Sequence, residues 1–234
     1  MFAGGAHAEG YVGGSFVAID QSDTDVTSID GRYLLGDNFM LDGGYSYADG
    51  DANVLRIGAH AFVHNAEWLL GGYAGYEDID SSGTSFHDWT AAGEGQYYFD
   101  RATISALVSY GETGNRPFGA ALKQWTFGGD VRYFVTDNFG LRARAAWVQE
   151  EINVIDHDGS IIDVGAEYQF SDAPVSVTAG YRHTEALFDS LDSWGIGLRW
   201  NFGDATLLQR DHSGARLHRP GGVVETFAGG ITLD

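Results

Sequence analysis

The chain of 234 residues contains no cysteine, which excludes disulfide frameworks and thiolate chemistry. A formal net charge of −20 repels nucleic acid and argues against a phosphate-tracking function. The 34 Gly, 14 Phe, 12 Tyr and 6 Trp residues are typical of a strand-rich protein, and no apolar run is long enough to predict a transmembrane helix.

The first eight residues, MFAGGAHA, look like the end of a secretory signal peptide. Ala6 and Ala8 form an A-x-A cleavage pattern immediately before Glu9. We therefore interpret residues 1–8 as the remnant of a signal peptide, with a short flexible leader as the alternative.

From residue 9 to residue 202, apolar and polar side chains alternate in repeated short stretches. A side-chain period of two is that of a β-strand, and no segment has the longer period of a helix. The pattern predicts an all-β chain of about twelve strands. We expect them at residues 9–19, 28–35, 39–48, 53–64, 67–78, 85–99, 102–112, 122–135, 139–150, 160–170, 175–184 and 192–202.

The connections between these strands are alternately long and short. Short ones, rich in Asp, Asn, Gly or Pro, are expected at residues 36–38, 65–66, 100–101, 136–138 and 171–174. Long ones, which carry most of the acidic residues, are expected around residues 20–27, 49–52, 79–84, 113–121, 151–159 and 185–191. This alternation predicts an up-and-down antiparallel barrel in which the first strand pairs with the last, because lipid cannot satisfy a free strand edge.

One face of each predicted strand is apolar. In the last strand, Trp194, Ile196, Leu198, Trp200 and Phe202 share that face. Aromatic residues gather near both ends of the apolar faces, as in the interfacial belts of a membrane barrel. The outer belt would comprise Trp89, Tyr110, Trp125, Trp147, Tyr181 and Trp194, and the inner belt Phe39, Trp68, Phe99, Tyr133, Phe139, Phe170 and Phe202. A soluble β-sandwich also alternates, but two belts at fixed heights favour a transmembrane barrel.

The polar faces would line a narrow lumen that is rich in charge. We expect the inward set to be Asp30, Arg32, Asp42, Arg56, His60, Glu94, Asp130, Arg132, Arg142, Arg144, Asp163, Glu167, Arg182 and Arg199. Guanidinium groups that face carboxylates would create a transverse field, which selects solutes by size and charge. The same pairs would also hold a closed, structural barrel together, so pairing alone does not discriminate between the two.

Other constellations predict little chemistry. His60 and His64 share a face but lie too far apart along a strand for one metal ion. Residues 156–160 only faintly match a calcium loop, since Ile161 stands where glycine belongs. No Ser, His and Asp are marked as a nucleophile with its base. We therefore expect no catalytic residue, metal or cofactor, with a lipid-modifying enzyme kept as a minor alternative.

Residues 203–234 depart from the strand pattern and are comparatively basic. We favour a disordered periplasmic extension for this tail. A plug that folds back into the lumen, with its arginines meeting inward carboxylates, is the second possibility. A short added strand at residues 223–227 is the third.

The segment SWGIGLRWNF at residues 193–202 resembles the final strand of Gram-negative outer-membrane proteins. In that family an alternating, Phe-ended strand is read by the barrel-assembly machinery, which implies that role for Trp194, Trp200 and Phe202. With the strand pattern from Tyr11 onward, the chain looks like a small porin-family barrel, although the Phe normally ends the protein and here a tail follows.

The resemblance implies an integral protein of the bacterial outer membrane, with its last strand ending in the periplasm. We expect a passive channel for small hydrophilic solutes, with a closed structural or surface-interaction barrel as the alternative. Its partners would be those solutes, outer-membrane lipid and lipopolysaccharide, and the barrel-assembly machinery, but not nucleic acid.

Overall fold

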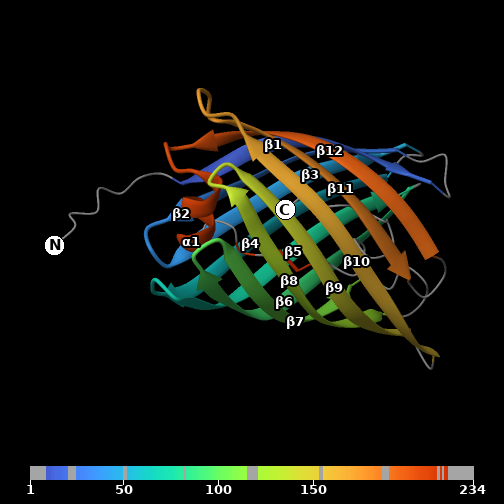
Figure 1. Ribbon diagram of the computed structural model, residues 1–234. Coiled ribbons are helices and arrows are strands. Elements are labelled where there is room, and N and C mark those ends of the chain that lie inside the picture. Colours follow the sequence, from blue (N-terminus) through green and yellow to red (C-terminus); the bar gives the residue numbers. More distant parts are fainter. Residues whose placement is uncertain are drawn as a thin grey trace.

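The computed structural model is a closed barrel of twelve antiparallel strands (Figure 1). It describes residues 9–20, 25–49, 52–81, 83–114, 121–152, 155–185, 190–214, 217 and 219–220. The strands are β1 (Gly10–Ile19), β2 (Asp25–Leu35), β3 (Phe39–Ala48), β4 (Ala52–His64), β5 (Trp68–Ser81), β6 (Thr84–Phe99), β7 (Ala102–Thr113), β8 (Leu122–Thr136), β9 (Phe139–Ile152), β10 (Ile155–Gln169), β11 (Val175–Glu185) and β12 (Ser190–Phe202). The signal-peptide remnant predicted at residues 1–8 lies outside the described residues.

Each strand pairs with its neighbours in the chain, and β1 closes the barrel against β12. Val12 lies opposite Trp200, and Phe16 lies opposite Ile196. This closure confirms the prediction that the first strand pairs with the last. The closure leaves no unpaired strand edge among the twelve described strands. Hydrocarbon could not satisfy the backbone hydrogen-bonding groups of such an edge.

The strands extend further toward the loop end than the sequence pattern predicted. Residues 79–81 belong to β5, and β9 and β10 continue to Ile152 and Ile155, which lie opposite each other. The long connections expected around 79–84 and 151–159 are therefore wrong in their extent. The polar residues of these segments indicated loops. Pairing between strands depends on backbone groups, however, so the strands continue through polar sequence beyond the apolar faces. Ile79 is buried against Val54, which stabilises this extension.

The outer surface is apolar and carries aromatic rings at a common height. Trp89, Tyr110 and Trp125 follow one another around the barrel at ring-centroid distances of 5.4 and 5.0 Å. Phe127 and Trp147 continue the row at 5.6 Å. The outer aromatic belt is thus a connected row of rings, which suits a bilayer interface on the loop side.

Tyr73 occupies space inside the barrel that two glycines provide. A Cβ added at Gly58 or Gly75 would lie 2.5 or 2.2 Å from the Tyr73 hydroxyl oxygen. The Tyr73 ring also packs against His60 at 4.6 Å between ring centroids. Glycine within these strands therefore serves close packing of an inward aromatic side chain.

The segment after β12 forms helix α1 (Leu207–His212) at the short-turn end of the barrel, on the left in Figure 1. Thr206 caps the helix, with a capping box to Gln209. The amide of Leu208 donates to the carbonyl of Asp137 in the β8–β9 turn at 3.1 Å. Among the described residues, no helix is long and apolar enough to cross a membrane.

Candidate functional site

All ten of the lumen residues predicted for selectivity point inward in the structure. Nine of them are buried and Arg142 is half-buried. They come from eight strands, which follow around the wall in the order β2, β4, β6, β8, β9, β10, β11 and β12. The residues are Arg32, Arg56, Glu94, Asp130, Arg132, Arg142, Arg144, Glu167, Arg182 and Arg199. In a strand whose other face is apolar, the charged side chains lie on the lumen side. Because these charges are buried there, they need partners of opposite sign.

Three arginines share one carboxylate on the β9–β11 side of the wall. Asp163 lies 3.0 Å from Arg142 Nη2, 3.8 Å from Arg144 Nη1 and 3.4 Å from Arg182 Nη2. Arg144 and Arg182 are its direct cross-strand partners. Three guanidinium groups thus converge on one carboxylate in this part of the lumen wall.

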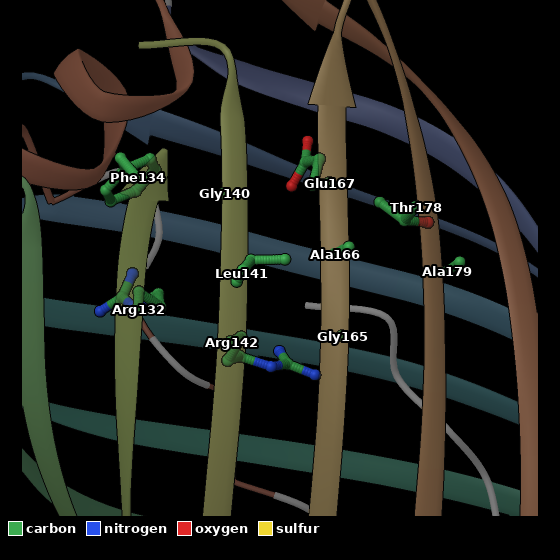
Figure 2. A pocket seen from close by; sticks show the side chains of 10 residues that line it. All are labelled: Arg132, Phe134, Gly140, Leu141, Arg142, Gly165, Ala166, Glu167, Thr178 and Ala179. Atoms are coloured by element: carbon green, nitrogen blue, oxygen red, sulfur yellow. The ribbon is translucent and has the colours of Figure 1, made fainter. Parts of the chain in front are cut away.

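The same region of the wall contains a pocket, shown in Figure 2. Arg142 reaches across from β9 toward β10, and Glu167 lies on β10 nearer the turn end. Small residues such as Gly165 and Ala166 form the floor between them. Charged groups thus border a small recess in the lumen wall.

Glu167 is held by partners on the two following strands. Arg199 Nη1 lies 3.2 Å from its Oε2, and the Ser176 hydroxyl donates to its Oε1 at 2.6 Å. The Arg199 guanidinium also stands over the ring of Tyr11 at 4.4 Å, a cation–π contact across the β1–β12 closure. These contacts fix the direction of both charges.

On the opposite side of the lumen, the buried carboxylates of the described residues outnumber the arginines. His60 lies between two of them, with Nδ1 at 2.9 Å from Glu94 and Nε2 at 3.3 Å from Asp42. Arg56 Nε pairs with Glu77 Oε1 at 3.0 Å. Acidic groups on β3 to β6 therefore face the arginine-rich strands β8 to β12, and the lumen has two walls of different charge.

Arg132 joins the wall to the C-terminal tail. Its Nε lies 3.2 Å from Asp130 Oδ2, and its Nη2 donates to the Ser105 hydroxyl at 3.1 Å. Its Nη1 pairs with the carboxylate of Asp211 in α1, which also accepts a hydrogen bond from the Thr103 hydroxyl. The described tail thus lies inside the barrel mouth, which differs from the disordered periplasmic extension favoured from sequence.

Inward apolar residues at the turn end explain this placement, and the sequence analysis missed them. Met40, Phe62, Leu69 and Tyr98 form a buried cluster with Leu217 of the tail. They break the rule that inward side chains are polar, and that break is visible in the sequence at the turn ends of β3 to β6. A water-filled mouth would expose these side chains, whereas Leu217 covers them.

The three aromatic residues expected from sequence to serve assembly lie on the outer surface. Trp194 and Trp200 are exposed there and Phe202 is half-buried at the turn end of β12. The faint calcium motif at residues 156–160 lies within β10 rather than in a loop. In the described part of the chain, no group of three or more acidic or histidine side chains is arranged to hold a metal ion.

Solved structures of outer-membrane channels share this fold. The KdgM porin in complex with disordered oligogalacturonate is 10% identical, with a TM-score of 0.66 over 82% of this chain and 99% of that one. The NanC porin is 9% identical, with a TM-score of 0.65 over 81% and 98%. The translocator domain of the autotransporter NalP from Neisseria meningitidis is 13% identical, with a TM-score of 0.55 over 86% and 90%.

Among curated protein sequences, no relative matches this chain. A family model does match, and it extends over residues 11–178, from β1 into β11. The match covers well over half of the chain and includes most of the charged lumen wall. The twelve-stranded closed barrel, its apolar outer surface and this match agree. The chain belongs to the porin subfamily.

Proposed function

We propose that this outer-membrane channel passes small hydrophilic solutes and favours those that carry a carboxylate. The observation that carries the proposal is the sharing of Asp163 by Arg142, Arg144 and Arg182. Guanidinium groups that line a narrow pore lower the electrostatic cost of an anion there. Arginine also binds carboxylates through two parallel hydrogen bonds, which a lysine does not.

Two further features support an acidic solute. In the register of β8 and β9, Arg132 lies directly opposite Arg142, and like charges in such positions repel each other. A solute carboxylate between them would relieve that repulsion. A structural neighbour, the KdgM porin, has been solved with oligogalacturonate, and the wall of this chain offers groups of the chemistry that such an acidic sugar needs.

The proposed partners outside the lumen follow from the outer surface. Lipid and lipopolysaccharide would contact the aromatic belts, since ring systems with one polar edge settle at membrane interfaces. Trp194, Trp200 and Phe202 would serve the barrel-assembly machinery, because they form the alternating face of the last strand. We assign no catalytic step to the protein, and transport down a gradient requires none.

The selectivity proposal is tested by replacing two arginines of the cluster, as Arg142→Ala with Arg144→Ala. The reversal potential of channel openings in a planar bilayer, measured under a KCl gradient, is expected to shift toward cations. Arg101→Ala is the matched control, because Arg101 forms an exposed ion pair with Asp137 at the turn end. An unchanged reversal potential in the double variant would refute the role of these arginines.

A further inference from the structure

The C-terminal segment covers the turn end of the lumen with apolar contacts. We define this segment as Ala205–Gly214 together with Leu217, Arg219 and Pro220 among the described residues. Leu207 and Leu217 are buried, and Gly214 approaches the Phe62 ring so closely that a Cβ there would lie 2.8 Å from it. The segment therefore fills the mouth that the wall alone would leave open.

Polar contacts anchor the same segment to strands around the whole barrel. Arg32 on β2 donates to the carbonyl of Leu217 at 2.5 Å. Arg210 donates to the Gln169 side chain on β10 at 2.7 Å, and the Ser213 hydroxyl donates to Glu9 at 2.5 Å. Each of these hydrogen bonds joins one charged group to one neutral group. The anchoring is thus broad but made of separable contacts.

The carboxylate of Asp211 occupies a built site on the wall. Thr103 and Arg132 lie opposite each other on β7 and β8, and both hold Asp211, which is fully buried. Arg142 is the next residue in the same row on β9. The site therefore combines the Thr103 hydroxyl donor with the Arg132 guanidinium, and a carboxylate of this chain already fills it.

We propose that the C-terminal segment is an internal plug of the turn-side mouth, and that Asp211 stands in for a solute carboxylate in the Thr103–Arg132 site. A soluble carboxylate competes for that site and shifts the segment toward its unseated state. Arg132 keeps Asp130 as a wall partner when Asp211 leaves, so release does not strand a buried charge. This gating rests on the proposed channel function.

The first test compares the full chain with a chain that ends at Phe202. The shortened chain ends on the aromatic residue that normally ends the family's last strand, so assembly is retained. In planar bilayers the shortened chain is expected to conduct steadily, whereas the full chain opens rarely. Equal open probabilities would overturn the plug and leave the channel intact. A lack of conduction in both chains would overturn the proposed function and the gating together.

The second test does not depend on conduction. The chain has no cysteine, so Met40→Cys introduces a single thiol beneath Leu217. A charged, water-soluble methanethiosulfonate reagent is expected to modify it slowly in the full chain and much faster in the chain that ends at Phe202. Ser171→Cys, on an exposed turn, is the control and reacts equally in both. Equal rates at Met40→Cys would overturn the plug whatever the channel conducts.

The third test addresses the Asp211 site itself. Asp211→Asn keeps the shape of the side chain and loses its charge, which is expected to raise the unseated fraction by about tenfold to a hundredfold. Asp204→Asn, exposed just before the segment, is the control. Replacing chloride by acetate at constant ionic strength should raise the open probability of the full chain toward that of Asp211→Asn. An open probability of the full chain that acetate leaves unchanged would refute the competition.

Discussion

Asp163 controls the balance of charge in the arginine-rich wall. Its carboxylate is almost completely buried and is shared by Arg142, Arg144 and Arg182. Along the row that crosses these strands, Asp130, Arg144, Asp163 and Arg182 alternate in sign. Each guanidinium in this row therefore has a carboxylate beside it, and the loss of Asp163 removes one negative charge from the middle of the row.

Asp163→Asn is expected to destabilise the barrel and to increase its preference for anions. Breaking a buried ion pair costs about 3–5 kcal/mol, and water in the lumen reduces that figure. Urea unfolding in lipid vesicles measures the first effect and the reversal potential in a KCl gradient measures the second. Asp137→Asn, in an exposed pair with Arg101, should cost about 0–1 kcal/mol. A shift of Asp163→Asn toward cations would contradict the charge balance described for this wall.

Among the secondary elements, the short turns fix the register of the strands that they join. In the β4–β5 turn, the side-chain oxygen of Asn65 accepts hydrogen bonds from the amides of Glu67 and Trp68 at 2.8 and 2.9 Å. This arrangement satisfies two amides that the strand ladder leaves unpaired. It also starts β5 at Trp68, which places Leu69 inward against the apolar cluster.

Asn65→Ala is expected to lower the free energy of unfolding by about 0.5–1.5 kcal/mol, because both amides then turn to water. Asn65→Asp keeps the accepting oxygens and should remain close to the original stability. Equilibrium unfolding of the three proteins in the same vesicles gives the comparison. Equal losses in both variants would show that the side-chain oxygen does not support the turn.

For the whole molecule, the decisive property is that its outer surface contacts hydrocarbon in the middle and water beyond the belts. Ile57 lies in the middle of β4, and Ile155 lies at the loop end of β10. Their exposed fractions are nearly equal, 59% and 57%. They therefore differ in depth rather than in accessibility.

Ile57→Arg should destabilise the folded barrel by about 2–4 kcal/mol, as a charge at the bilayer midplane does. Ile155→Arg should cost about 0–1 kcal/mol, because its guanidinium reaches water. Unfolding in vesicles measures both, and detergent micelles should narrow the difference. Similar costs at the two positions would contradict the assigned depth of the barrel in the membrane.

Strand faces and closure could be predicted from the sequence because a period of two assigns each residue to one side. Arg142 and Ile57 were placed correctly for that reason. The contacts of Asp211 could not be predicted, since they depend on where a tail without periodicity lies in space. Met40 and Phe62 stand out in the sequence as apolar residues on the otherwise polar inner face. The strand pattern does not show which residues cover them. Strand ends failed for a related reason, because polar residues beyond the membrane look like loops.

The anchoring of the C-terminal segment has a consequence for the order of events in biogenesis. Glu9 precedes β1, Thr103 belongs to β7 and Gln169 ends β10, and all three bind this segment. These groups surround one opening only after β1 has joined β12. An incomplete barrel lacks some of these binding groups. Under the proposed plug, the segment therefore reaches its full set of contacts only once the wall is closed.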